Sequence, residues 1–424
     1  MARAMHDSEF GRAARDSGIL RLMDDLGGAI NRDAGVQMLG GGNPAAIPAV
    51  EKVFRAEIEA MLADGRAFER MVGNYDSPQG NDAFIEALAE LLSGALGQPL
   101  TRDNIAVTNG SQAAFGALFN MFAGRARGGK VKKILLPMTP EYIGYADLLP
   151  GVRHGFTAAR PRIEELDDWR FKYRLDFERL RIGDDIGAVC ISRPTNPSGN
   201  VITDDELARL RRMAREAGVP LIVDGAYGPP FPGIVFTRAT PCWDENMILC
   251  LSLSKLGMPG ARTGIVVARP EIIAHITESN AIFTLAPGRF GPSLAARLLA
   301  NGGEKLTALC AQHITPYYRE RSRRAGELLR EAAHGVPLRV HASEGAIFLW
   351  LWFPGMPVSG DALYRRLKRR GVLVVAGEHF FPGLKGAWRH REECIRVTFA
   401  AEAAQLERGI AAIGEEARRA YAAR

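Results

Sequence analysis

Between about residue 46 and residue 300, short apolar runs bounded by turn residues alternate with segments of helical periodicity. This alternation is typical of a parallel β-sheet with helices packed on its faces, so the expected fold class is α/β. The final strand should run antiparallel, because only a short turn separates it from the strand before it. Six strands are expected: Ile105–Thr108, Lys133–Leu136, Ile186–Ser192, Pro220–Asp224, Met247–Leu251 and Gly264–Ala268.

After about residue 300 the pattern changes, which indicates a second and smaller domain. A long helical segment to Arg330 is followed by β-rich runs at Val336–Pro354, Gly371–Ala376 and Cys394–Ala400, and by a final helix from Ala403. We therefore expect an N-terminal arm or lid at 1–45, a large domain at 46–300, and an α+β domain at 301–424.

Composition argues against several classes of protein. The five cysteines are odd in number and widely spaced, which favours core residues over a disulfide framework or a metal site. The net charge of +6 comes largely from basic segments with helical periodicity, and these are expected to be solvated helix faces rather than nucleic-acid contacts. No apolar run reaches the ~18 residues of a membrane span, and the charged N-terminus is unlike a secretory signal. We expect a cytoplasmic protein.

Lys255 stands at the end of the apolar strand Met247–Leu251, within the segment Ser252–Arg262. Open α/β sheets bind their ligands at the carboxyl ends of strands. A lysine there can bind an aldehyde covalently, while Ser252, Ser254 and Arg262 can hold that aldehyde's phosphate. This combination points to pyridoxal 5'-phosphate. A strand-end lysine that extends to solvent is the alternative.

Three other segments also follow predicted strands. Gly110, Ser111 and Gln112 open a helix, whose amides suit a phosphate, although an ordinary helix cap explains the same pattern. Asn196 can donate to a phenolate oxygen of the cofactor, or can belong to a plain turn. Asp224 ends an apolar strand and needs a cationic partner, such as a protonated pyridine nitrogen; Tyr227 can share the phenolate with Asn196.

With these motifs the chain resembles the fold-type I pyridoxal-phosphate aminotransferases. The family patterns N-P-x-G, D-x-A-Y and S-x-S-K-x-x-x-x-G-x-R are matched by Asn196–Gly199, Asp224–Tyr227 and Ser252–Arg262. The resemblance implies a mostly parallel seven-stranded sheet in the large domain. It also implies that Lys255 and Asp224 are catalytic, with the carboxylate of Asp224 keeping the ring nitrogen protonated.

Further segments resemble one branch of this family, in which a small or branched aliphatic amino acid, valine above all, exchanges its amino group with a 2-oxo acid such as pyruvate. These segments are Leu39–Pro44, Asn74–Gly80, Pro140–Tyr145, Pro230–Ile234 and Glu344–Phe353.

The same resemblance implies a homodimer with two active sites at the subunit interface. Tyr142 would stack on the cofactor ring as a catalytic residue, and Tyr75 would reach the phosphate bound by the neighbouring subunit. Arg396, with Gly42 and Asn196, would bind the substrate α-carboxylate, a role that suits the planar guanidinium.

Three alternatives stay open. A C–S lyase or decarboxylase of the same fold would hold the cofactor in the same way. An aminotransferase with dicarboxylate or broad specificity is a second, because Arg289 stands where a small residue is expected and could bind a distal carboxylate. A transcriptional regulator is the third, but it needs a DNA-reading module, for which the segment before Leu39 offers little room.

Overall fold

The computed structural model of the protein describes residues 35–149, 152 and 154–423. The largest sheet in this part of the chain has eight strands. Their order is β2 (Ile105–Thr108), β11 (Gly264–Val267), β10 (Met247–Ser252), β9 (Leu221–Asp224), β8 (Ile186–Ser192), β4 (Val131–Leu136) and β3 (Gly124–Arg125), and β5 (Phe156–Ala158) also pairs with β4. All six strands expected from the sequence are present, each end within two residues of its expected position. The two-residue β3 adds an eighth strand to the seven-stranded sheet that the resemblance implies.

Strand direction places several chain segments at one edge of this sheet. β11 is antiparallel to both of its neighbours, β10 and β2, as the short turn before it predicts. β10, β9, β8, β4 and β5 are parallel to one another. Since β2 runs opposite to β11, it shares their direction, and the carboxyl ends of β2, β8, β9 and β10 lie at the same edge.

Helices cover both faces of the sheet because successive strand residues point to opposite sides. In β10, Leu249 and Leu251 belong to one hydrophobic core, and Ile248 and Cys250 belong to the other. The first core includes residues of α5 (Asp82–Leu96), α7 (Asp204–Glu216) and α9 (Phe290–Leu299). The second includes residues of α6 (Ser111–Phe122) and α8 (Pro270–Thr284).

The starts of these helices follow local sequence signals. Thr203 and Glu206 form a capping box at the start of α7, and its first turn is acidic, which suits the helix dipole. Asn81 caps α5 by accepting a hydrogen bond from the Phe84 amide, and α8 begins with proline.

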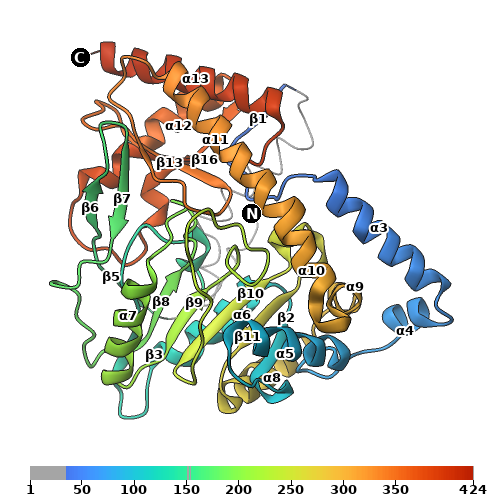
Figure 1. Cartoon of the computed structure of the whole chain (residues 1–424). Coiled ribbons are helices and arrows are strands. Elements are labelled where there is room, and N and C mark those ends of the chain that lie inside the picture. The colour runs from blue at the N-terminus through green and yellow to red at the C-terminus, as the bar shows by residue number, and fades with distance from the viewer. Residues whose placement is uncertain (1–34, 150–151, 153, 424) are drawn as a thin grey trace, which may run out of the picture.

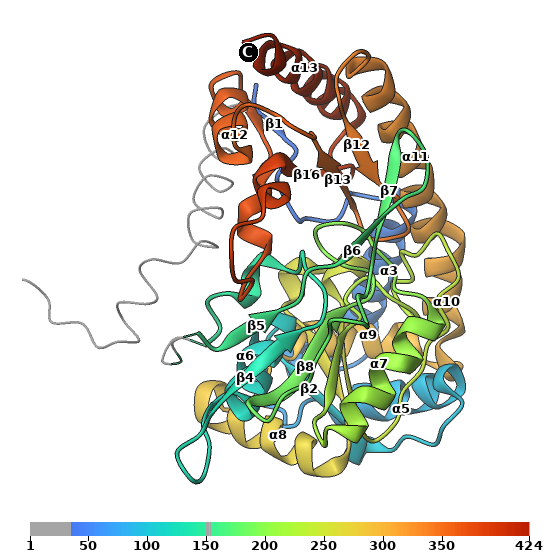
Figure 2. The ribbon, with the colours of Figure 1, turned by 90° about the vertical axis from the view of Figure 1, so that its left-hand side faces the viewer.

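A second, six-stranded sheet lies above the first in Figures 1 and 2. Its order is β15 (Val375–Ala376), β16 (Cys394–Thr398), β13 (Phe348–Trp352), β12 (Arg339–His341), β7 (Arg170–Arg174) and β6 (Arg162–Glu165). The β6–β7 hairpin comes from the middle of the chain and joins this sheet through parallel pairing of β7 with β12. The division into domains at residue 300 stays a prediction. It did not anticipate that a hairpin from before residue 300 pairs with strands from after it.

The helices of the C-terminal part pack on this second sheet and connect it to the first (Figure 1). They are α10 (Glu304–Leu309), the π-helical turn Cys310–Ile314, α11 (Thr315–Ala332), α12 (Gly360–Arg369) and α13 (Ala403–Ala422). At the other end of the chain, α3 (Pro48–Ala63) and α4 (Ala67–Gly73) project to one side of the molecule. Short 3-10 helices occupy 102–104, 143–145, 254–256, 259–261, 301–303, 377–380 and 389–393.

The expected N-terminal arm is described only in part, because residues 1–34 lie outside the described residues. Its remainder includes β1 (Gln37–Met38), which pairs with β14 (Val372–Leu373) of the C-terminal part. All five cysteines are free thiols. Among the described helices, none combines the length and apolar character that a bilayer span requires.

Candidate functional site

A cavity of about 130 Å³ opens at the carboxyl edge of the large sheet. It collects side chains from the start of α6, the segment before β5, and the ends of β8, β9 and β10. Most of the site residues expected from the sequence line it. The lining residues are Ser111, Gln112, Phe115, Tyr142, Ser192, Pro194, Asn196, Asp224, Ala226, Tyr227, Ser252, Ser254, Lys255 and Arg262.

Lys255 lies in a 3-10 turn directly after β10, and its side chain crosses to the N-terminal segment of the chain. Its Nζ donates a hydrogen bond of 2.6 Å to the carbonyl oxygen of Gly42. Burial, together with the nearby charges of Arg396 and Arg262 and against that of Asp224, lowers the pKa of Lys255 to about 8. A substantial neutral fraction at physiological pH makes this amine a nucleophile and a base.

Asp224 is the last residue of β9, where its carboxylate faces the cavity. Tyr145 Oη donates to Oδ2 at 2.7 Å, and the Ala226 amide donates to Oδ1 at 2.9 Å. Burial raises the pKa of Asp224, and these two donors and Lys255 counteract that rise. A carboxylate held in this way suits a cationic partner in the cavity, such as a protonated ring nitrogen.

The other end of the cavity has the donors that a phosphate needs. Gly110 precedes α6 at φ +85°, and a Cβ atom there would lie 2.2 Å from Arg262 Nη2. Only glycine therefore lets the guanidinium lie against this loop. Arg262, Ser252, Ser254 and Ser111, the first residue of α6, all line the cavity. The donor set fits a dianionic phosphate at a helix N-terminus.

Arg396 extends from β16 of the second sheet and joins Asn196 to the N-terminal segment. Its Nη1 donates to Asn196 Oδ1 and its Nη2 donates to the Gly40 carbonyl oxygen, both at 2.7 Å. Its Nε has no hydrogen-bond partner among the described residues. The guanidinium also lies over the Phe348 and Phe380 rings, at 4.1 and 5.2 Å from their centroids. A buried guanidinium with an unused donor is suited to a carboxylate ligand.

Of the other site residues predicted from the sequence, Tyr142, Tyr227 and Gln112 lie at the cavity, whereas Tyr75 does not. Tyr142 and Tyr227 line the cavity, and the Tyr142 ring contacts Tyr145 edge-on at 5.4 Å. Gln112 Nε2 donates to the Gly144 carbonyl oxygen at 2.9 Å, which ties α6 to the turn after Tyr142. Tyr75 does not line this cavity and is 84% exposed, and its predicted role at the neighbouring subunit's phosphate stays a prediction.

Sequence reasoning missed a group of polar side chains next to Asp224, of which Ser192 also lines the cavity. Glu141, Tyr145 and Ser192 are connected by hydrogen bonds that end at Asp224. Two of the three stand in Pro140–Tyr145, a segment that the sequence singled out only through the family resemblance. No signal in the sequence identifies Glu141, because its burial depends on residues from other parts of the chain.

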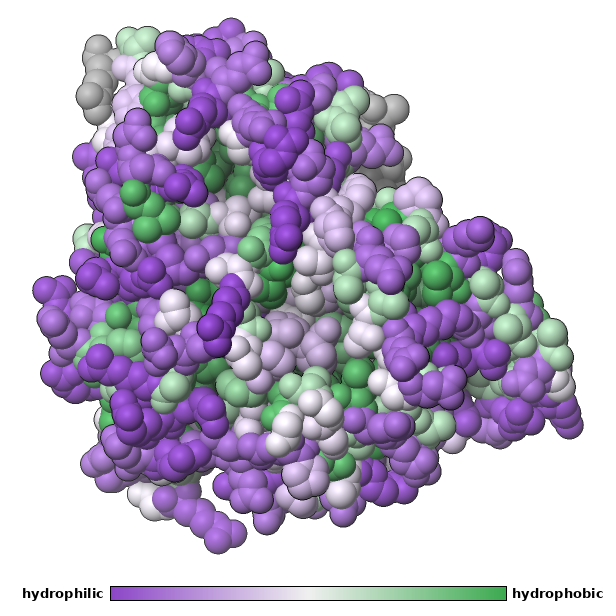
Figure 3. Space-filling view, in the orientation of Figure 1, coloured by the Kyte–Doolittle hydropathy of each residue, from purple (hydrophilic) through white to green (hydrophobic). Residues whose placement is uncertain are grey.

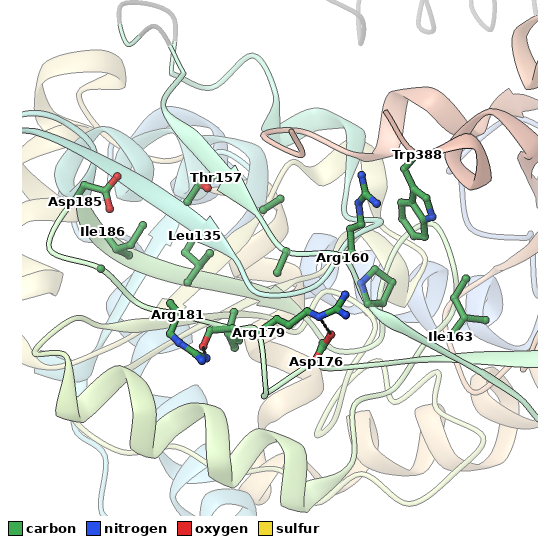
Figure 4. A pocket seen from close by; sticks show the side chains of 15 residues that line it. Leu135, Thr157, Arg160, Ile163, Asp176, Arg179, Arg181, Asp185, Ile186 and Trp388 are labelled. Atoms are coloured by element: carbon green, nitrogen blue, oxygen red, sulfur yellow. Dashed lines mark hydrogen bonds and ion pairs between the residues drawn. The ribbon is translucent and has the colours of Figure 1, made fainter. Parts of the chain in front are cut away.

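A larger cavity, of about 690 Å³, lies between β4, β5 and the segment 176–185 (Figure 4). Three arginines line it, but each has a protein partner. Arg179 lies 3.7 Å from Asp176, Arg160 donates to the Ala387 carbonyl oxygen, and Arg181 donates to the Leu180 carbonyl oxygen. It shares no lining residue with the cavity beside Lys255. Within the described ranges, no group of three or more His, Cys, Asp or Glu side chains is placed to hold a metal ion.

Comparisons with known proteins agree with this geometry. The family model of class I and II aminotransferases matches residues 37–413. The chain is 47% identical to the valine–pyruvate aminotransferase of Escherichia coli K12 over 409 residues, which cover 96% of this chain and 97% of that protein.

Solved structures give the same result. A Psychrobacter arcticum protein assigned as an amino-acid aminotransferase has a TM-score of 0.96 at 45% identity, covering 99% of this chain and all of that one. The valine–pyruvate aminotransferase of Salmonella typhimurium LT2 has a TM-score of 0.88 at 46% identity, covering 96% of this chain and all of that one. This chain therefore belongs to the class I and II aminotransferases, with the fold-type I architecture.

Proposed function

We propose that the protein is a pyridoxal-phosphate-dependent aminotransferase that exchanges the amino group of valine with pyruvate, giving 2-oxoisovalerate and alanine. The observation that carries this proposal is the single cavity in which Lys255, Asp224 and Arg262 meet. When bound, pyridoxal 5'-phosphate supplies an aldehyde that takes up amino groups and a ring that accepts electrons. The cavity's donors, anion and amine match the phosphate, ring nitrogen and aldehyde of that cofactor.

Lys255 is proposed to hold the cofactor covalently in the resting enzyme. With its amine free, Lys255 would take the proton from the α-carbon of the bound amino acid. Burial keeps the pKa of Lys255 at about 8, so the amine is poised to accept and return a proton near neutrality. The Gly42 carbonyl oxygen, 2.6 Å from Nζ, holds the free amine at the cavity.

Asp224 and the phosphate-binding residues have complementary roles. We assign Asp224 to the protonated ring nitrogen and Asn196 and Tyr227 to the phenolate oxygen. Tyr142 is assigned to the face of the ring. The set proposed for the phosphate is Gly110, Ser111, Gln112, Ser252, Ser254 and Arg262. Tyr75 of a second subunit completes this set in the dimer proposed below.

Arg396 is proposed to bind the α-carboxylate of the amino acid, together with Asn196 and Gly42. Its two present contacts hold the guanidinium in place and leave Nε without a hydrogen-bond partner in the described part of the chain. The rings of Phe348 and Phe380 lie against this arginine, which is 3% exposed.

Two observations support valine and pyruvate as substrates. The first is the similarity over nearly the whole chain to two enzymes named valine–pyruvate aminotransferases. The second concerns Arg289, whose Nε lies at ion-pair distance from Asp76 Oδ1, 3.3 Å, although the two atoms lack hydrogen-bond geometry. The Asp76 carboxylate neutralises this guanidinium, so Arg289 is a poor candidate for a distal carboxylate of the substrate.

A panel of half-reactions tests the substrate assignment. The purified protein, loaded with the cofactor, is mixed with single amino acids, and the loss of its visible absorption is followed. We expect valine and alanine to react fastest, and the aminated protein to be restored by pyruvate and 2-oxoisovalerate. Faster reaction with aspartate or glutamate would reject the valine–pyruvate assignment. Release of ammonia or carbon dioxide in step with the reaction would indicate a lyase or decarboxylase instead.

We further propose a homodimer with shared active sites. Exposed hydrophobic side chains gather on α3 and α4, and Figure 3 shows green patches over this projection. More of them lie at the end of α8 and the start of α9, beside the loop that carries Tyr75. The Asn280 side chain donates to the Pro78 carbonyl oxygen, and Arg289 pairs with Asp76, so this loop is fixed there. The exposed set is Leu62, Phe68, Val72, Tyr75, Ile282, Phe283, Leu285 and Phe290.

Mixed dimers test whether Tyr75 serves the neighbouring site. Lys255→Ala and Tyr75→Ala subunits are each expected to be impaired alone. If Tyr75 acts across the interface, a hybrid dimer has one site with both defects and one with neither, so activity returns. No recovery in hybrids whose formation is confirmed would place Tyr75 elsewhere. Since the proposed substrates are free metabolites, we propose a cytoplasmic location.

A further inference from the structure

Glu141 is an acidic residue in the protein interior that the proposed reaction does not use. Its side chain is fully buried, with 0% of its surface exposed. Its Oε1 accepts a hydrogen bond of 2.8 Å from the Ser192 amide, and its Oε2 lies 2.6 Å from Ser192 Oγ. The Tyr142 amide also donates to Oε2, at 3.3 Å. An acid with these contacts and no cationic side chain among them needs a physical explanation.

Ser192 is linked through Tyr145 to Asp224, which lines the cofactor cavity. Ser192 Oγ lies 3.3 Å from Tyr145 Oη, and Tyr145 Oη lies 2.7 Å from Asp224 Oδ2. Glu141, Ser192 and Tyr145 are all at most 2% exposed. Asp224 is the partly exposed member of this chain of four side chains, and it faces the cavity.

Counting protons distinguishes two charge states of Glu141. Three contacts between oxygen atoms join the four side chains, at 2.6, 3.3 and 2.7 Å, and the hydroxyls of Ser192 and Tyr145 supply two protons. If Glu141 is a carboxylate, Ser192 donates to it, Tyr145 donates to Asp224, and the 3.3 Å contact between Ser192 and Tyr145 has no proton. If Glu141 is a neutral acid, it donates to Ser192, and Ser192 can donate to Tyr145. Asp224 accepts from Tyr145 and from the Ala226 amide, as a carboxylate does.

We propose that Glu141 is a neutral carboxylic acid that donates to Ser192, and that Ser192 and Tyr145 pass this orientation on to Asp224. The hydroxyl protons of Ser192 and Tyr145 then both point toward Asp224. Asp224 stays a carboxylate, with its negative charge facing the ring nitrogen of the cofactor. Glu141 is thus a positioning residue that acts through Asp224. The cofactor end of this inference rests on the proposed function, whereas the protonation of Glu141 does not.

The surroundings favour the protonated form. Burial, opposed by the Ser192 contacts and the Tyr142 amide and assisted by the negative charge of Asp224, raises the pKa of Glu141 to about 8. The other titratable neighbours, Tyr145 and Cys190, have pKa values raised well above their usual range by burial and so stay neutral. Lys255 is linked to the group through Asp224, whose pKa it lowers.

Infrared spectroscopy of the cofactor-free protein tests the protonation directly. A protonated carboxyl group has a carbonyl band distinct from that of a carboxylate. We expect wild type minus Glu141→Gln to show this band near pH 6, and to lose it as the pH rises through about 8. Glu378→Gln is the matched control, because Glu378 is another acid whose pKa is raised by burial. Absence of the band from the difference spectrum would overturn the proposal.

Cofactor affinity tests the link to Asp224. In Glu141→Gln the amide can donate to Ser192 Oγ and accept from the Ser192 amide, so Kd for pyridoxal 5'-phosphate should stay within about threefold of wild type. Glu141→Ala leaves both Ser192 groups unpaired, and we expect Kd to rise roughly tenfold or more. If Gln is as poor as Ala, the residue acts as an anion and the proposal fails. If Ala binds as well as wild type, the residue does not act on Asp224.

A double variant separates this coupling from a general loss of structure. Ser192→Ala breaks the chain beyond Glu141, so adding Glu141→Ala to it should weaken binding by less than about twofold more. If the increases in Kd of the two single variants multiply in the double variant, Glu141 and Ser192 act independently and the proposed series is wrong. Failure of the wild-type protein to bind the cofactor through Lys255 would reject the proposed function and leave the infrared result on Glu141 standing.

Discussion

The cavity beside Lys255 is several times smaller than the one beside Arg179, about 130 against 690 Å³. In the larger cavity the charged groups already have protein partners, as Figure 4 shows for Asp176 and Arg179. In the smaller one, opposite charges lie near one another without a direct ion pair: Lys255 donates to a carbonyl oxygen, and Asp224 accepts from a tyrosine hydroxyl and a backbone amide. Charged groups that converge from several strands without pairing with one another identify a site better than volume does.

Removing the amine should have the largest effect. Lys255→Ala is expected to lose at least about 10³-fold in the amino-acid half-reaction, because it removes both the covalent attachment and the base. Borohydride reduction should no longer fix the cofactor to the chain. Lys133→Ala, which removes the partner of Asp185 at the larger cavity, is the matched control and should stay near wild type. Labelling of Lys133 or Lys172 in wild type would reject the assignment of Lys255.

Neutralising the anion should come next. Asp224→Asn keeps the shape of the side chain but removes the charge, so the half-reaction should slow by about 10²- to 10³-fold while the thermal unfolding temperature changes little. Asp176→Asn makes the same change in the larger cavity and should have no comparable effect. Near-normal turnover of Asp224→Asn would mean that another group holds the ring nitrogen.

The pKa of Lys255 predicts how cofactor attachment depends on pH. Only the neutral amine attacks an aldehyde, and burial lowers the pKa to about 8. The attachment rate in cofactor-free protein should therefore rise about tenfold per pH unit below this value and level off above it. A lysine with the usual pKa of about 10.4 would show a continued rise to higher pH. Stopped-flow absorbance at a series of pH values distinguishes the two.

Arg289 should matter least. Arg289→Ala removes a largely buried ion pair with Asp76 of the Tyr75 loop but no group assigned to the cofactor or substrate, so kcat/KM is expected to change by no more than about threefold. The order of substrates, with valine and alanine ahead of aspartate, should be unchanged. Arg179→Ala is the control for removal of a surface arginine. If Arg289→Ala abolishes activity toward a dicarboxylic amino acid, Arg289 binds the distal carboxylate of the substrate, and the predicted preference for aliphatic side chains is wrong.

The strands and most cavity residues were predictable because both depend on local signals. Apolar runs such as Met247–Leu251 identify buried strands, and parallel strands bring the residues that follow them to one edge. Gly110 and Arg262 could be assigned to one phosphate site from the sequence, because a phosphate ligand explains both residues. Arg396 was found only by family resemblance, because its position in β16 gives no sign of which face it takes.

The β6–β7 hairpin and the role of Glu141 were not predictable in this way. Pairing of Val340 with Arg170 joins residues far apart in the chain, and no periodicity records such a contact. The environment of Glu141 depends on Ser192 and Phe380, which come from two different sheets or their connections. Burial of an acid is visible only when all of these elements are assembled.

The β6–β7 hairpin also orders events during synthesis of the chain. β7 leaves the ribosome long before β12, its partner in the second sheet, and at roughly 5–20 residues per second this interval is on the order of ten seconds. During it, the edge of the hairpin that will pair with β12 is without that partner. A fragment that ends near residue 300 would keep this edge permanently open. We therefore expect such a fragment to aggregate, although it contains every strand of the large sheet.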